Sequence, residues 1–270
     1  MNNITTHPEH DKLIDNIQEL ENHLAILVKS RDKLLFHIGP KLHTEYMLKV
    51  GKLEYAIFDY HCKILRLKRK IEMIQSCLNR DISYNIDEIE DQLEKEFYEY
   101  NIKLKEKQNE IEKARLRNSS FGRTLTDEES SELRRLYTEI VKRLHPDLNP
   151  DLTVEQHGQY IDAVNAYKNA DLTELRIIYL LLEKTTRTRS YLGTSLDKLT
   201  DRHKSLLIEK DHLISEIDLI KKRFPFIYIN LITKKGKLNK LINELSEQLS
   251  CYCDQYNSLE IKLQEVINDE

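Results

Sequence analysis

The chain has 270 residues, of which 33% are charged, and it contains only six glycines, five prolines and no tryptophan. This composition favours long helices over sheets. The formal charge of −4 and the pI near 6.2 argue against a protein that must bind nucleic acid. No C-x-x-C pair is present, so we favour reduced structural thiols over a disulfide or a metal site for the four cysteines, Cys62, Cys77, Cys251 and Cys253.

We do not expect the first ten residues, MNNITTHPEH, to be a signal peptide. They are polar and lack the apolar core of a signal peptide, so we expect residues 1–10 to be disordered. No apolar run in the chain approaches the roughly 18 residues that a membrane-spanning helix needs. The sequence therefore predicts no membrane segment and a cytoplasmic location.

Three runs of apolar residues at alternating steps of three and four follow. They extend from Leu13 to Ile38, from Tyr46 to Leu78 and from Ile86 to Ala114. Such heptad spacing is typical of helices that pack on other helices. We expect Gly39-Pro40 to end the first helix and separate it from the second. Because the breaks between the runs are short, neighbouring helices are predicted to be antiparallel. Residues 11–117 are thus predicted to form an N-terminal coiled-coil arm, either a helical hairpin or a three-helix coiled coil.

An amphipathic helix is predicted after a hinge at residues 118–123. Thr126 and Glu129 have the spacing of a capping box, which marks a helix start. Four apolar residues then share one face, and Pro146 disfavours helical geometry at His145, so the helix should stop there. The residues after Pro146 are expected to form an exposed loop. The shared face consists of Leu133, Tyr137, Ile140 and Leu144.

Two further helices are predicted after this loop. Thr153 with Gln156 forms a second capping box, and the helix that follows carries Asn165-Ala166-Tyr167. We favour core positions over contacts for Tyr137 and Tyr167, leave open a surface hydroxyl on Tyr137, and expect Asn165 to fix the loop or a helix end. Asp171 begins a third helix with a broad apolar surface.

These features together resemble the J domain of the DnaJ (heat-shock-40-like) co-chaperones: a basic amphipathic helix, His-Pro-Asp at its end, an Asn-Pro-Asp-like continuation and a downstream Asn-Ala-Tyr. The resemblance covers residues 124–184. It implies that the two helices pack antiparallel, and that the loop and the basic face dock on a DnaK-type chaperone and stimulate its ATP hydrolysis. The chaperone-binding residues that it implies are His145, Pro146, Asp147, Arg134, Arg135, Lys142, Arg143 and Asn149.

The chain departs from the J family in three ways. No Tyr-x-x-Leu-Gly motif lies between Asn118 and Thr126, so the first helix of the family is missing and its supporting surface must come from elsewhere. We expect that surface from residues 175–182 or from the end of the third run. Thr138-Glu139 stands where family members commonly carry basic residues. The Gly/Phe-rich segment and the cysteine-rich zinc module of the full-length DnaJ type are absent.

A linker at residues 185–195 leads into the last part of the chain. Leucines at a spacing of seven start at Leu199, Phe224-Pro225-Phe226 interrupts the pattern, and a second long seam follows. Residues 193–268 are therefore predicted to form an antiparallel coiled-coil hairpin. The predicted fold is all-α, with antiparallel coiled-coil arms flanking a small J-like helical module.

Each of these features also has a plainer interpretation. Pro after a helix and Asp in a turn are common, so His145-Pro146-Asp147 alone is compatible with an ordinary helix stop. The arginines of the preceding helix are compatible with a solvated face. For the basic clusters at residues 66–70 and 234–237, a solvated face is favoured over nucleic acid because acidic residues surround both clusters.

The sequence supports one leading hypothesis and two alternatives. The leading one is a J-domain co-chaperone, whose Asp147 carboxylate bonds an arginine of a DnaK-type chaperone while the arms bind a client, an assembly partner or a second copy. The first alternative is a coiled-coil scaffold that uses a J-like fold for protein docking without chaperone stimulation. Nucleic-acid binding is the weaker third. No catalytic motif is present, so we expect no enzyme activity, no cofactor and no metal site.

Overall fold

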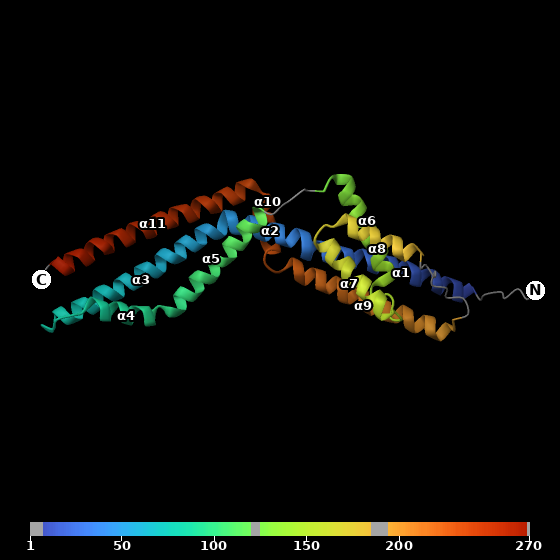
Figure 1. The fold of residues 1–270 in the computed structure, drawn as a ribbon, viewed down its shortest axis with the longest axis horizontal. Coiled ribbons are helices and arrows are strands. Elements are labelled where there is room, and N and C mark those ends of the chain that lie inside the picture. The colour runs from blue at the N-terminus through green and yellow to red at the C-terminus, as the bar shows by residue number, and fades with distance from the viewer. Residues whose placement is uncertain (1–7, 120–124, 185–193, 269–270) are drawn as a thin grey trace, which may run out of the picture. The chain divides into compact units, whose positions relative to one another are not determined.

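A computed structural model describes residues 8–119, 125–184 and 194–268, and every described element is a helix (Figure 1). The predicted all-α class is confirmed, since no strand occurs in these ranges. Within the same ranges, no helix is both long enough and apolar enough to cross a membrane. The predicted disorder at residues 1–10 is wrong for its last part, because α1 already begins at Pro8.

The described helices divide between two compact units, each of which combines an early and a late part of the chain. Unit 1 contains Met1–Pro40 and Arg123–Ile227, and unit 2 contains Lys41–Gly122 and Tyr228–Glu270. The division differs from the expected arms at residues 11–117 and 193–268, because each of these ranges contributes to both units. A heptad seam requires a neighbouring helix but does not specify which one. The entropic cost of closing a loop rises slowly with the length of the loop, by about 0.6 kcal/mol for each doubling.

Unit 1 is built on a parallel pair of helices from opposite ends of the chain. His10 lies 2.9 Å from the carbonyl of Thr194, Glu21 pairs with Arg202, and Arg31 pairs with Glu216. Because residue numbers rise together along both helices, the two run in the same direction. The helices of this unit are α1 (Pro8–Lys33), the π-helical η1 (Leu34–Ile38), α6 (Asp127–Leu144), α7 (Val154–Lys168), α8 (Leu172–Lys184) and α9 (Leu196–Lys221).

One hydrophobic core joins this pair to the three central helices. α1 contributes its seam at steps of three and four, and α9 contributes leucines at a spacing of seven. Each fully buried leucine adds about 1.5–3 kcal/mol relative to an exposed one. The core thereby fixes α6, α7 and α8 on α1. The residues from the pair are Ile17, Leu20, Leu24, Val28, Leu199, Leu206 and Leu213.

Unit 2 contains one antiparallel and one parallel pairing. Arg66 pairs with Glu94 and Lys70 pairs with Glu90, so residue numbers rise along α3 as they fall along α4, and the two helices are antiparallel. Tyr46 stacks on Tyr228, and Tyr60 meets Tyr256, so the start of α11 lies toward the start of α3. The helices are α2 (Gly39–Tyr46, shared with unit 1), η2 (Met47–Gly51), α3 (Lys52–Leu78), α4 (Ile86–Glu96), α5 (Tyr98–Ser119), η3 (Phe226–Tyr228, shared with unit 1), α10 (Ile229–Thr233) and α11 (Lys235–Asn268).

The late helices therefore do not form the predicted antiparallel hairpin. α9 pairs in parallel with α1 inside unit 1, and α11 pairs in parallel with α3 inside unit 2. The predicted break at Phe224-Pro225-Phe226 is confirmed, since α9 ends at Lys221 and a short 3-10 turn starts at Phe226. That break lets one continuous late segment supply a helix to each unit.

The predicted helix break at Gly39-Pro40 is wrong. Helical hydrogen bonding continues from Pro8 to Leu78, with π-helical turns at residues 34–38 and 47–51. The Gly39 amide donates to the carbonyl of Leu34, five residues back. Pro40 has no amide hydrogen to donate, and the irregular bonding of a π turn tolerates that loss. Most of the expected hinge at 118–123 and linker at 185–195 lies outside the described residues.

Candidate docking loop

The helix before the candidate loop begins and ends where local chemistry requires. The Thr126 amide donates to the Glu129 carboxylate at 2.9 Å, and the Glu129 amide donates to the Thr126 hydroxyl at 3.2 Å, which confirms the first capping box. At the other end His145 has extended backbone angles, φ −66° and ψ 127°, as a residue before proline prefers. The α6 helix therefore stops at Leu144, directly before the loop.

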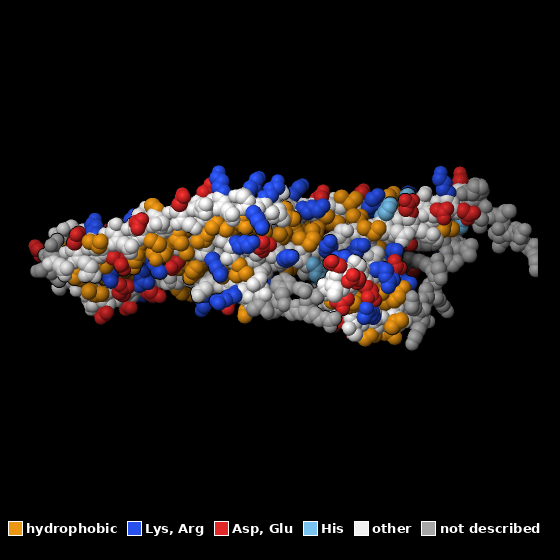
Figure 2. Space-filling model, turned by 90° about the horizontal axis from the view of Figure 1, so that it is seen from above, with side chains coloured by type: hydrophobic (Ala, Val, Ile, Leu, Met, Phe, Trp, Pro, Cys, Tyr) orange, Lys and Arg blue, Asp and Glu red, His pale blue; other side chains and the backbone are white. Residues whose placement is uncertain are grey.

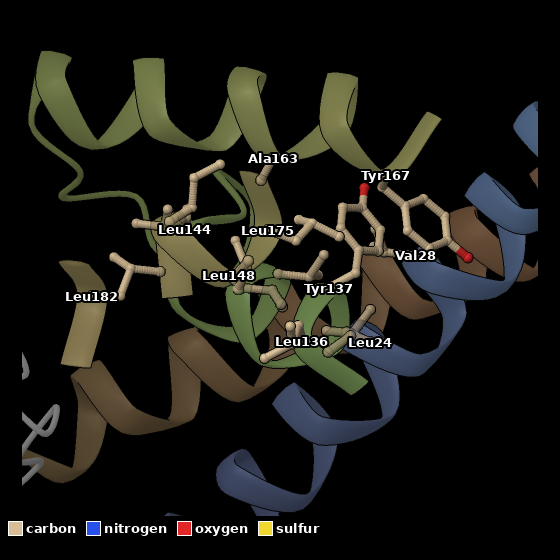
Figure 3. Packing of buried hydrophobic residues seen from close by; sticks show 14 of the residues in the cluster. Leu24, Val28, Leu136, Tyr137, Leu144, Leu148, Ala163, Tyr167, Leu175 and Leu182 are labelled. Atoms are coloured by element: carbon tan, nitrogen blue, oxygen red, sulfur yellow. The ribbon is translucent and has the colours of Figure 1, made fainter. Parts of the chain in front are cut away.

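The next helix returns antiparallel to α6. The rings of Tyr137 and Tyr167 stack with centroids 4.0 Å apart, and the His145 ring meets the Tyr160 ring edge-on at 5.3 Å. Higher numbers on α6 therefore face lower numbers on α7. Figure 3 shows both stacked tyrosines among the buried leucines of the unit 1 core. The loop at residues 145–153 lies at the tip of this helical pair.

Tyr137 is a core residue, as expected, and the alternative of a surface hydroxyl does not hold. Tyr137 is completely buried, and its hydroxyl donates to the Asp32 carboxylate of α1 at 2.6 Å. Asp32 is only 2% exposed and is also bonded by Arg31 at 2.9 Å. Burial, followed by the negative charge of Asp32, raises the pKa of Tyr137, so the hydroxyl stays a donor. The predicted burial of Tyr167 is confirmed.

His145 lies inside the unit rather than on its surface. Its exposed fraction is 5%, and burial lowers its pKa, so the ring is neutral at pH 7. Nδ1 accepts a hydrogen bond from the Asp147 amide at 3.2 Å, which assigns the ring proton to Nε2. The ring therefore shapes the loop from within, and it is poorly placed for the direct polar contact with a chaperone that the resemblance implies.

Asp147 is the part of the motif that reaches solvent. Its side chain is 51% exposed, and its carboxylate lies 3.7 Å from His145 Nδ1. Glu209 of α9 is a neighbour: burial, and then the charge of Asp147, raise the pKa of Glu209. Pro146 beside it is partly buried. The carboxylate at the tip is thus available to a cation from outside.

Asn149 acts on the helix that precedes it. Its side-chain amide donates to the carbonyl of Lys142 at 3.0 Å and to that of His145 at 3.3 Å. The Lys142 carbonyl would ordinarily accept from the amide of residue 146, but Pro146 has no amide hydrogen, so Asn149 satisfies this carbonyl at the end of α6. The amide group predicted to bind a chaperone is therefore used within the protein. Asn165 is exposed, and its backbone carbonyl accepts from the Asn169 amide at the end of α7.

The four basic residues of α6 do not form one open patch. Arg135 and Arg143 lie over the ring of Tyr179 in α8, at 5.9 and 5.4 Å from its centroid. Lys142 pairs with Glu139 at 2.9 Å. Arg134 donates to the Ser131 hydroxyl and points about 100° away from its neighbour Arg135. Glu139, the departure noted in the sequence, thus neutralises one of the cations next to the loop.

Three elements support the α6–α7 pair and its loop. α8 packs on α6, as expected for residues 175–182, and Arg176 of α8 pairs with Glu132 of α6. α1 supplies Asp32, and α9 supplies Arg202, whose guanidinium bonds the loop. The end of the third run, in α5, belongs to unit 2. Sequence reasoning missed Asp32 and Arg202; the one signal was Arg31, which interrupts the apolar seam of α1.

Most of the first basic cluster, residues 66–70, is paired with acidic side chains. Arg66, Arg69 and Lys70 of the first basic cluster pair with glutamates of α4. Acidic and basic side chains lie intermixed on the face shown in Figure 2. The four cysteines are free, and the described residues contain no group of three or more potential ligands that is placed to hold a metal ion.

No protein-family model matches this chain, and no curated protein or solved structure matches it either.

Proposed function

We propose that this chain is a J-domain-type co-chaperone that docks on a DnaK-type chaperone and stimulates its ATPase. One observation carries the proposal: an antiparallel helical pair holds His145-Pro146-Asp147 at its tip with the Asp147 carboxylate half exposed. This arrangement is what the resemblance implies for residues 124–184. The proposal includes the expected cytoplasmic location.

In this proposal the Asp147 carboxylate accepts hydrogen bonds from an arginine of the chaperone. A hydrogen bond to a charged group contributes about 1.5–3 kcal/mol, enough to select one docked geometry but not to make a permanent complex. Arg134, Arg135 and Arg143 would steer an acidic surface toward the loop, so docking weakens as salt rises. The J protein performs no reaction itself; it shifts its partner's conformation by binding one state better.

The remaining helical surface would carry the client. We propose that the parallel pairs α1–α9 and α3–α11 present a client, an assembly partner or a second copy to the chaperone. Exposed apolar side chains on both pairs supply contact area, among them Ile208 of α9 and Ile261 of α11. A mass measurement in solution distinguishes a second copy from a different partner.

The test compares ATP turnover by a DnaK-type chaperone alone, with the wild-type chain and with Asp147→Asn. The amide keeps the size of the side chain but removes its charge, and the residue is exposed, so the fold is retained. Asp162→Asn, at an exposed position on α7, is the matched control. We expect stimulation by the wild type and by Asp162→Asn and its loss in Asp147→Asn. Equal stimulation by all three proteins refutes the role of the loop.

A second candidate function is a coiled-coil scaffold that uses the J-like fold for protein docking alone. The burial of His145 and the Lys142–Glu139 pair favour it, because both remove groups expected to meet a chaperone. A wild-type chain that binds no DnaK-type chaperone at low salt, while it captures another partner through its helical pairs, supports the scaffold function.

A further inference from the structure

A single guanidinium connects the candidate loop to both helices of the parallel pair. Arg202 of α9 donates from Nη1 to the Asp147 carbonyl at 3.3 Å and from Nη2 to the Leu148 carbonyl at 2.6 Å. Nη2 also lies 3.1 Å from the Glu21 carboxylate of α1. The Arg202 side chain is mostly buried. Residues separated by more than fifty positions in the sequence therefore meet at the loop.

Arg202 bonds the backbone of the loop and does not bond the Asp147 carboxylate. Both loop acceptors are carbonyl oxygens, and the side chain of Asp147 remains half exposed. Within the loop, the Leu148 and Asn149 amides also donate to the His145 carbonyl, and the Asp147 amide donates to His145 Nδ1. Fixing two successive carbonyls restricts the peptide planes on either side of Leu148. The direction in which the carboxylate points is set by that backbone.

The planar fork of an arginine suits this position. Its several donors lie in fixed directions, so one side chain can bond two carbonyls and a carboxylate together. The Glu21 carboxylate balances the charge that burial would otherwise penalise. A lysine carries one ammonium group and cannot hold the same three acceptors in the same geometry.

We propose that α9 completes the docking site and that Arg202 is the positioning residue for the Asp147 carboxylate. This inference rests on the proposed co-chaperone function and adds to it. The site is then a composite of the α6–α7 loop with α1 and α9, and it extends beyond residues 124–184. The α1–α9 pair takes the place of the first helix that J domains carry before the basic helix. A change that separates α9 from α1 also loosens the loop.

Hydrogen exchange of the full chain tests whether Arg202 holds the loop. Arg202→Ala should speed exchange at the Leu148 and Asn149 amides, while the middle of α6 stays as protected as in the wild type. Arg202→Lys should give an intermediate rate. Lys204→Ala, which removes a positive charge at an exposed position of the same helix, is the control and should change nothing. Wild-type exchange at both loop amides in Arg202→Ala overturns the inference.

A titration of ATPase stimulation tests whether the held loop matters for docking. Because Arg202→Ala keeps the Asp147 carboxylate, it should raise the concentration that gives half-maximal stimulation and still reach the wild-type maximum. Asp147→Asn lacks the charge and should not reach it. An unchanged half-maximal concentration in Arg202→Ala, despite faster loop exchange, overturns the positioning role.

The two proposals fail in different ways. A wild-type chain that gives no stimulation removes the co-chaperone function, whatever the loop does. The hold of Arg202 on the loop is decided by exchange alone, without a chaperone present. Glu21→Gln is the control for general unfolding. It removes the negative charge that pairs with Arg202 and leaves both bonds from Arg202 to the loop in place. It should loosen the loop less than Arg202→Ala does.

Discussion

Replacing Tyr137 by phenylalanine tests the bond that joins the candidate docking module to α1. The substitution removes only the hydroxyl, which donates to the buried Asp32 carboxylate at 2.6 Å. A hydrogen bond to a charged group contributes about 1.5–3 kcal/mol. Asp32 keeps its bond from Arg31 at 2.9 Å, so we expect a loss near the lower end of that range. The stacking of the ring on Tyr167 is retained.

The assay is native-state hydrogen exchange of α6, because a chain with two units does not unfold in one step. A loss of about 1.5 kcal/mol in the free energy of opening speeds exchange roughly tenfold. Tyr98→Phe, which removes the hydroxyl of an exposed tyrosine in α5, should have no effect on α6. If Tyr137→Phe leaves α6 exchange at the wild-type rate, the Tyr137–Asp32 bond does not hold the module on α1.

Three further predictions concern the same unit. Leu206→Ala should destabilise unit 1 by about 2–5 kcal/mol, measured by native-state hydrogen exchange of α9, whereas Leu207→Ala should destabilise it far less, because the two side chains are 1% and 39% exposed. Asn149→Ala should lower the stability of the end of α6 by about 1 kcal/mol for each hydrogen bond lost. Hydrogen exchange should become faster in the last turn of α6 and stay unchanged in its first turn. Burial lowers the pKa of His145 below its ordinary 6.5, so the unfolded chain binds the proton more readily than the folded chain does. The stability of unit 1 should therefore fall as the pH drops below about 6.5. His145→Gln should make the stability of unit 1 less dependent on pH.

The sequence determined the parts of the fold that depend on neighbouring residues. Thr126 and Glu129 mark the start of α6, and Pro146 marks its end, because capping bonds and the backbone restriction before proline act within a few residues. The apolar spacing likewise predicted which face of α6 is buried. The local signal gave a wrong prediction at Pro40. A proline usually ends a helix, but here the helix continues past Pro40 through π-helical turns.

The tertiary structure alone decided which helices meet. The seams of α1 and α9 show that each needs a partner, but apolar leucines at heptad spacing do not distinguish a near neighbour from a distant one, or a parallel from an antiparallel pair. That choice of partners brought Arg202 to the loop and Asp32 to Tyr137. The break in the α1 seam at Arg31 marked a polar position but did not identify either contact. The sequence therefore predicted the helix α6 and the loop after it, whereas only the tertiary structure showed that α1 and α9 support them.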